Sequence, residues 1–376
     1  MLCPHCMYEG KLVNGSCARC GYILAGTLSR PLSLDTPRSA SRPLAEPTVR
    51  RGDILHEGRY RLMNQMELPE TQRTQGTAWS ALDNRAANRR VVIREIRVPE
   101  QRGRNTPADQ MAYEAAQRLS ELGKHQGFPQ VLDFFREKGT YFLVLLYPEG
   151  ESLASLLKRQ GGALPEYMIA EYGYQLCGLL ALLAVQQPPM VHGSINPETI
   201  IISEDRQFAS LIHIPLFHPD PLPAGVEKGP AGYYAPEQIR GSIAPTSDLY
   251  SLAVVMHHAV TGYDPYARLA LFHPPARRLN PATTAQMEMI LVRQLSLSPA
   301  QRYGNPGEMQ QDLASLIASY PDPTEEEQTP QAVNPLTLSS AQLRERSRSM
   351  TMLNMGVFAA ICVLLLIGML FAVLRP

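Results

Sequence analysis

Residues 229–238 read Gly-Pro-Ala-Gly-Tyr-Tyr-Ala-Pro-Glu-Gln, and this stretch, with the patterns around it, decides the fold. Alternating and β-branched residues predict strands at 60–63, 78–82, 90–96, 131–135 and 141–147. Apolar residues at helical spacing predict helices at 108–122, 153–159, 167–185, 247–260, 285–295 and 307–319. A five-stranded lobe followed by a helical lobe is an α+β arrangement.

The chain from about residue 53 to residue 320 resembles a bacterial Ser/Thr protein kinase domain. Ala235-Pro236-Glu237 is similar to the A-P-E motif that ends the activation segment of that family. Asp248 is similar to the residue at the start of the central helix of the large lobe, and Arg302 to the arginine that pairs with the A-P-E glutamate. The resemblance implies a protein-kinase-like two-lobe fold and an ion pair between Glu237 and Arg302.

The positions that carry phosphotransfer chemistry in this family hold other residues here. The family frame H-R-D-x-x-x-x-N falls on residues 192–199. Ser194 then occupies the position of the base, Asn196 that of the lysine and Thr199 that of the Mg²⁺-binding asparagine. His213 replaces the D-F-G aspartate, and neutral imidazole is a poor ligand for Mg²⁺. A serine hydroxyl does not take a proton at neutral pH without a partner, so the sequence predicts no catalytic residues, no Mg²⁺ and no enzyme.

The nucleotide-binding positions are also altered. The Gly-rich loop survives only as Gly76, in a stretch at 67–77 with about four extra residues. Arg94 replaces the strand lysine, and Glu114 fits the helix glutamate that pairs with that lysine in the family. An Arg94–Glu114 pair could tie the helix to the sheet, as a purely structural salt bridge or with a residual contact to a nucleotide. The sequence leaves open whether ATP binds.

Two C-x-x-C pairs near the N-terminus predict a structural zinc site. Cys3 and Cys6 form the first pair, and Cys17 and Cys20 form the second after ten intervening residues. Four thiolates at this spacing suit tetrahedral Zn²⁺, and the pattern resembles a short zinc ribbon over residues 1–26. Two redox motifs or two disulfides are the alternative, but a redox C-x-x-C normally occurs singly inside a larger strand–helix fold.

Two expected linkers and an apolar run complete the organisation. Residues 27–52 are rich in Pro, Ser and Arg, and residues 321–352 combine prolines with acidic and Ser/Arg-rich sequence, so both are predicted to be flexible or disordered. Residues 353–374 include twenty consecutive residues without a charged side chain, enough at about 1.5 Å per residue to span a bilayer as one transmembrane helix. Three arginines precede this run and one follows it, which predicts a tail-anchored, single-pass protein of the cytoplasmic membrane with its N-terminal domains in the cytoplasm.

Charge restricts the function further. The 35 Lys and Arg residues balance 35 Asp and Glu residues, which argues against nucleic acid as a partner. These features predict a membrane-tethered pseudokinase that acts as a non-catalytic protein-binding, scaffolding or regulatory module in signalling. Its partner is expected to be a protein, either a true kinase or a component of the envelope or of secretion. The alternatives are a pseudokinase that senses nucleotide by binding ATP without Mg²⁺ and, as the weakest, an atypical phosphotransferase.

Overall fold

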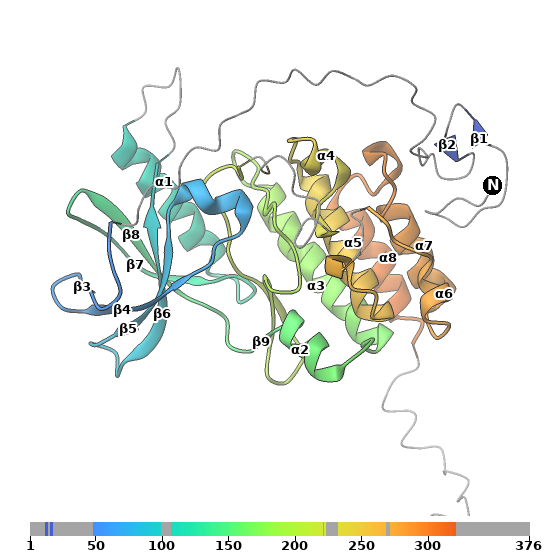
Figure 1. Cartoon of the computed structure of the whole chain (residues 1–376), viewed down its shortest axis with the longest axis horizontal. Coiled ribbons are helices and arrows are strands. Elements are labelled where there is room, and N and C mark those ends of the chain that lie inside the picture. The colour runs from blue at the N-terminus through green and yellow to red at the C-terminus, as the bar shows by residue number, and fades with distance from the viewer. Residues whose placement is uncertain are drawn as a thin grey trace, which may run out of the picture. The chain divides into compact units, whose positions relative to one another are not determined.

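The two lobes expected from the sequence are present in the computed structural model of the chain. The residues that it describes are 12–13, 16–17, 48–98, 107–220, 222, 232–267 and 271–320. Within them a sheet-rich lobe comes first and a helical lobe follows (Figure 1). The predicted α+β two-lobe arrangement is therefore confirmed.

One antiparallel sheet forms the body of the first lobe. Its strands lie in the spatial order β3 (Ile54–Leu55), β4 (Tyr60–Met66), β5 (Ala78–Asp83), β6 (Arg89–Ile96), β8 (Thr140–Leu146), β7 (Gln130–Glu137). Helix α1 (Ala108–Leu122) contacts β7. The sheet has one strand more than predicted, because β3 is too short to show an alternating pattern. Strand β3 pairs antiparallel with β4, with Ile54 opposite Arg61 and Leu55 opposite Tyr60.

The first lobe begins before residue 53, where the sequence places its boundary. Val49 is buried in the same apolar cluster as Tyr60. The hydroxyl of Thr48 donates a hydrogen bond of 3.1 Å to the carboxylate of Glu95 on β6. Residues 48–52 therefore belong to the lobe and not to the predicted linker at 27–52.

Strand β6 lies inside this sheet and is buried on both faces from Val91 onward. Because side chains alternate along a strand, Val91 and Ile93 pack on one face, whereas Val92 and Ile96 pack on the other with buried residues of α1. Arg94 shares the face of Val92 and Ile96. The alternation thus directs a cationic side chain into the interior of the protein.

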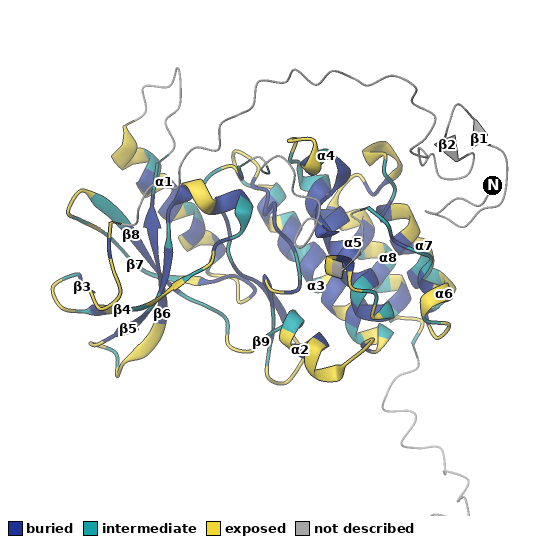
Figure 2. Cartoon of the chain, viewed as in Figure 1, coloured by how far each residue is buried: buried dark blue, intermediate teal, exposed yellow. Residues whose placement is uncertain are grey.

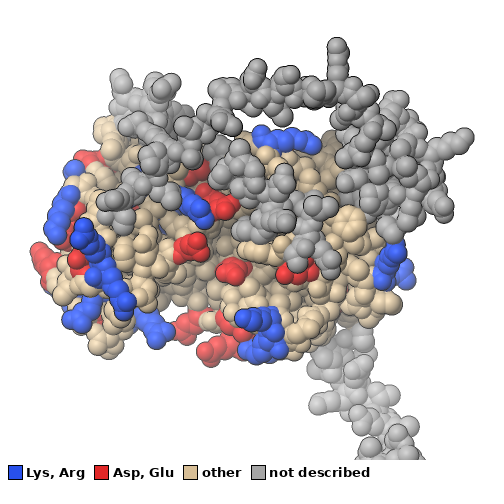
Figure 3. Space-filling view, in the orientation of Figure 1, with Lys and Arg blue, Asp and Glu red and all other residues tan. Residues whose placement is uncertain are grey.

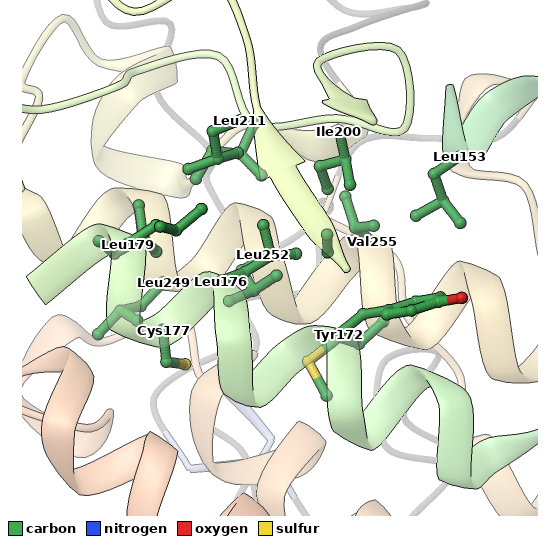
Figure 4. Packing of buried hydrophobic residues seen from close by; sticks show 14 of the residues in the cluster. Leu153, Tyr172, Leu176, Cys177, Leu179, Ile200, Leu211, Leu249, Leu252 and Val255 are labelled. Carbon is green, nitrogen blue, oxygen red and sulfur yellow. The ribbon is translucent and has the colours of Figure 1, made fainter. Parts of the chain in front are cut away.

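The second lobe is organised around a long helix, α3 (Glu166–Ala184). Its other elements are β9 (Glu151–Ser152), α2 (Leu153–Gln160), β10 (Ile200–Ile202), β11 (Ala209–Leu211), α4 (Pro236–Ile239), α5 (Pro245–Thr261), η3 (Pro265–Ala267), α6 (Ala276–Leu279), α7 (Ala285–Gln294), η4 (Pro299–Gln301) and α8 (Pro306–Ile317). Helix α3 contacts both α5 and α8. Figure 4 shows Leu176 and Leu179 of α3 close to Leu249 and Leu252 of α5 and to Leu211 of β11. Buried residues accordingly line the facing sides of these elements (Figure 2).

Among the described helices, only α3 is long and apolar enough to cross a membrane. Half of its most apolar window is buried inside the lobe, and Tyr172, Leu176 and Cys177 belong to the core (Figure 4). Core packing therefore accounts for its composition. The transmembrane helix predicted at 353–374 lies outside the described residues, as does the linker at 321–352.

A two-stranded hairpin is described near the N-terminus. Strand β1 (Leu12–Val13) pairs antiparallel with β2 (Ser16–Cys17), with Leu12 opposite Cys17. The side chains of the predicted zinc ligands, Cys3, Cys6, Cys17 and Cys20, lie outside what the structure describes. The zinc ribbon stays a prediction.

A buried ion pair joins α4 to the chain after α7. Arg302 donates from Nη1 to Oε1 of Glu237 at 2.7 Å and from Nη2 to Oε2 at 2.9 Å. The hydroxyl of Ser247 also donates to Oε1, at 2.9 Å. Burial alone would raise the pKa of Glu237, but the Arg302 hydrogen bonds and charge hold it below its ordinary value. The predicted Glu237–Arg302 pair is confirmed.

Replacing Glu237 with Ala should lower the free energy of unfolding by about 3 kcal/mol or more, because the Arg302 charge would stay buried without its partner. Urea unfolding followed by circular dichroism measures this change. The matched control is Glu114→Ala, which removes an exposed carboxylate and should change stability by less than about 0.5 kcal/mol. Similar losses for the two variants would show that the pair does not hold the lobe together.

Candidate functional site

One carboxylate fixes the loop that carries three of the substituted positions. Asp248, in the first turn of α5, accepts hydrogen bonds from the backbone N–H groups of His192 and Gly193, both at 2.7 Å. Burial raises the pKa of Asp248 to about 7, although the two N–H donors act in the opposite direction. Helix α5 therefore sets the path of the backbone that presents Ser194.

The side chains at the substituted loop positions bond within the protein. Ser194 is fully buried, and its hydroxyl lies 2.6 Å from the hydroxyl of Thr71. The hydroxyl of Thr199 donates to the carbonyl oxygens of Ser194, at 3.2 Å, and of Asn196, at 3.0 Å. The side-chain amide of Asn196 donates to the carbonyl oxygen of Ser194 at 3.1 Å. The side chains of Asn196 and Thr199 thus stabilise the loop itself, whereas that of Ser194 joins it to Thr71.

His213, at the position of the D-F-G aspartate, is held as a neutral imidazole. Its Nδ1 lies 3.2 Å from the hydroxyl of Tyr147, and the two rings meet edge to face. Burial, followed by the nearby charge of Arg94 and the ring of His192, lowers the pKa of His213 to about 3. The ring is therefore uncharged at neutral pH.

Arg94 reaches from β6 to the backbone that follows His213. Its Nη1 donates a hydrogen bond of 2.8 Å to the carbonyl oxygen of Ile214. Burial lowers the pKa of Arg94 to about 10, which still leaves the guanidinium charged at neutral pH. The residue at the strand-lysine position therefore contacts main chain in this conformation.

The expected pair between Arg94 and Glu114 is not formed. Glu114 lies on the exposed side of α1, where its carboxylate accepts a hydrogen bond of 2.9 Å from the side chain of Gln110. It borders a cavity of about 300 Å³ that Met111 and Arg118 also line. The expectation fails because Glu114 does not lie on the buried face of α1, which consists of the apolar residues Ala112, Ala115, Ala116, Leu119 and Leu122. A residual contact of Arg94 and Glu114 with a nucleotide stays a prediction.

The extra residues near Gly76 form a short 3₁₀ helix, η1 (Glu70–Gln75), which we call the plug. Thr71, Gln72 and Gln75 of the plug are buried despite being polar. Gln72 donates from its side chain to the carbonyl oxygen of His213. The plug thus lies against the loop at Ser194 and against the backbone after β11. Sequence reasoning missed it, although a polar insertion in place of glycines was the available signal.

Gln75 bonds to the main chain of residues 216–218 in both directions. Its Oε1 accepts from the N–H groups of Leu216, at 3.1 Å, and Phe217, at 3.2 Å. Its Nε2 donates to the carbonyl oxygen of His218 at 3.1 Å. Next to it Gly76 has a φ of 131°, and a Cβ there would lie 1.7 Å from the carbonyl oxygen of Glu95. The plug therefore ends at a position that only glycine can occupy.

A second set of bonds closes the exposed edge of the plug. The backbone N–H of Asp220 donates to the carbonyl oxygen of Thr71 at 2.6 Å. The hydroxyl of Thr74 donates to the Asp220 carboxylate, also at 2.6 Å. The plug is therefore bonded to residues 213, 216–218 and 220 of the segment that follows β11.

The side chains at the substituted positions form hydrogen bonds within the protein. Ser194, Thr199 and His213 offer no carboxylate, and each has a hydrogen-bond partner within the chain. Phosphotransfer requires positioned phosphates, a metal and an acceptor for the hydroxyl proton. In this arrangement the plug contacts occupy Ser194 and the carbonyl oxygen of His213.

The sequence of the chain is similar to those of known protein kinases. The model of the family described as "Protein kinase domain" matches residues 74–320. "Serine/threonine-protein kinase PknA" of Mycobacterium tuberculosis is 29% identical over 285 residues, which cover 71% of this chain and 63% of that protein. The protein of the same name from Nostoc sp. is 27% identical over 268 residues, covering 65% and 45%. "Serine/threonine-protein kinase PknL" of M. tuberculosis is 30% identical over 190 residues, covering 46% and 47%. The chain thus spans less than two thirds of the length of these relatives.

These matches contradict the prediction that the chain is not an enzyme. The family match and the relatives named as serine/threonine-protein kinases point to an active kinase. The prediction that the chain is not an enzyme rested on a few substituted positions in the catalytic motifs. The match over residues 74–320 instead rests on the sequence of the domain as a whole.

Proposed function

The chain belongs to the protein kinase domain family, and on that premise we propose that it is a signalling protein kinase whose site is closed by the plug until a protein partner withdraws it. The printed names of the relatives support phosphotransfer to serine or threonine as the activity. The described framework also supports it, since Asp248 orders the loop at 192–193 and Glu237 pairs with Arg302.

The observation that carries the proposal is the set of bonds between the plug and the site. Ser194 is enclosed against Thr71, and Gln75 binds the backbone of residues 216–218. A net hydrogen bond contributes only about 0.5–1.5 kcal/mol, so a handful of them closes the site without making the closure irreversible. A partner that binds the open form can therefore supply the difference.

The double variant Gln72→Ala, Gln75→Ala should bind nucleotide about tenfold more tightly than the natural chain. Removing the plug's side-chain hydrogen bonds raises the fraction of molecules in which the plug is open. The apparent affinity for nucleotide rises with that fraction, because only open molecules bind. Titration of the full chain with a fluorescent ATP analogue, with and without Mg²⁺, measures the change. Transfer of labelled phosphate to a serine- and threonine-containing protein is followed in parallel.

Arg73→Ala is the matched control, because this side chain lies in the plug but is exposed and has only long ion pairs of 3.9 Å. It should leave nucleotide affinity unchanged. If neither variant nor the natural chain binds nucleotide, the plug does not guard a nucleotide site. If the double variant binds nucleotide but transfers no phosphate in the presence of Mg²⁺, the proposed kinase activity is refuted. Nucleotide binding that needs no Mg²⁺ would favour a nucleotide sensor.

The partner in this proposal is a protein, either another kinase or a component of the envelope or of secretion. A membrane anchor at 353–374 supports that choice, because it would concentrate the domain next to such components. The anchor is itself part of the proposal and rests on the uncharged run in the sequence.

Deletion of residues 353–374 should move the chain from the membrane fraction to the soluble fraction. The expected cause is loss of an apolar helix long enough to span the bilayer. Fractionation of cells that express the two forms, followed by immunoblotting, measures the distribution. Replacing the run with an unrelated apolar sequence of equal length should restore the membrane fraction, and a deleted chain that still sediments with membranes would refute the anchor.

We also propose that Cys3, Cys6, Cys17 and Cys20 hold one structural zinc ion. Elemental analysis of the purified chain should find about one zinc per molecule, and the double variant Cys3→Ser, Cys6→Ser should lose it. Cys177→Ser is the control, since Cys177 is buried in α3 and burial raises the pKa of its thiol. Zinc that survives the double variant, or that is absent from the natural chain, would exclude this site.

A further inference from the structure

Arg94 is a buried cation to which the described residues supply no counter-charge. Its side chain is 1% exposed, and within the described part of the chain neither its Nε nor its Nη2 has a hydrogen-bond partner. Arg302 is similarly buried, but both oxygens of Glu237 meet its guanidinium. On the face that Figure 3 shows, several other Lys and Arg side chains lie at the surface, some of them beside acidic ones. Arg94 differs from both groups.

The groups that surround Arg94 are uncharged at neutral pH. Tyr147 and His213 line the same small cavity as Arg94. Burial raises the pKa of Tyr147 to about 12 and lowers that of His213 to about 3. Glu95, the next residue of β6, accepts its hydrogen bonds from two threonines, and Glu114 is exposed. No described carboxylate therefore balances the guanidinium.

A buried charge without a counter-charge destabilises the folded state, and each buried donor without an acceptor destabilises it further. The guanidinium does not escape this cost by losing its proton at neutral pH, because its pKa is about 10. An anion in contact with Nε and Nη2 would remove both penalties.

The space beside Arg94 is small. The cavity has room of about 10 Å³, which corresponds to a single water-sized sphere. Its remaining walls are mostly apolar, formed by Leu119, Leu122, Phe128, Pro129, Leu145 and Ile214. A monatomic anion is only slightly larger than water and so needs the least adjustment of these walls, whereas a water molecule would leave the charge unbalanced.

We propose that a chloride ion binds in this cavity against the guanidinium of Arg94. The ion takes the electrostatic role that the kinase pattern gives to Glu114. If α1 turned so that Glu114 faced inward, its carboxylate and the ion would compete for the same guanidinium. Chloride therefore stabilises the arrangement in which Arg94 binds Ile214 and Glu114 stays outside.

The test is thermal unfolding of the full chain in detergent, at constant ionic strength, as sodium gluconate is replaced by sodium chloride or bromide. We expect a saturable rise in Tm of a few degrees, because a ligand that binds only the folded state stabilises it by mass action. Arg94→Met should abolish the difference between halide and gluconate. Arg90→Met changes an exposed arginine of the same strand and should retain it.

A second readout needs no variant and so does not depend on how well Arg94→Met folds. Crystals grown in bromide should show an anomalous scattering peak in contact with the Arg94 guanidinium. A water molecule at that position in saturating bromide would overturn the proposal. Equal halide dependence in the natural chain and in Arg94→Met would overturn it as well.

Discussion

The hydrogen bonds from the backbone of His192 and Gly193 to Asp248 set the geometry on which the rest of the site depends. Asp248 is carried by α5, which packs against α3 in the middle of the helical lobe, so the loop acquires the rigidity of that core. Ser194 is thereby held where Thr71 can reach it. The plug closes against a surface that is already fixed, and its few bonds do not have to order the loop as well.

The plug supplies hydrogen-bond partners to the backbone of the segment that it covers. Buried polar groups need partners, and the backbone of residues 213–218 follows β11 without a neighbouring strand to pair with. A glutamine side chain carries both a donor and an acceptor, so Gln75 can serve this backbone much as another strand would. Water would satisfy the same groups in an open form. The closed form and the proposed open form would therefore differ by little in hydrogen bonding, as a reversible closure requires.

Local patterns predict much of this fold. Helix α1 has the bounds that Pro107 and the apolar spacing indicate, and the Glu237–Arg302 pair follows from two recognisable motifs. The outward position of Glu114 could not be predicted, because it depends on how α1 is rotated against the sheet. The plug was equally hidden, since Gln75 finds its partners more than a hundred residues later and no local periodicity records such a contact.

Gln75 binds main-chain atoms, so its contact does not depend on which side chains the covered segment carries. Leu216 and Phe217 can exchange for other apolar residues and still present the same N–H groups, so the contact tolerates change on that side. Gly76 has no such freedom, because any side chain there would collide with the carbonyl oxygen of Glu95. The contact between the plug and residues 216–218 can thus persist through extensive divergence of the segment that is covered, whereas the glycine at position 76 must be retained.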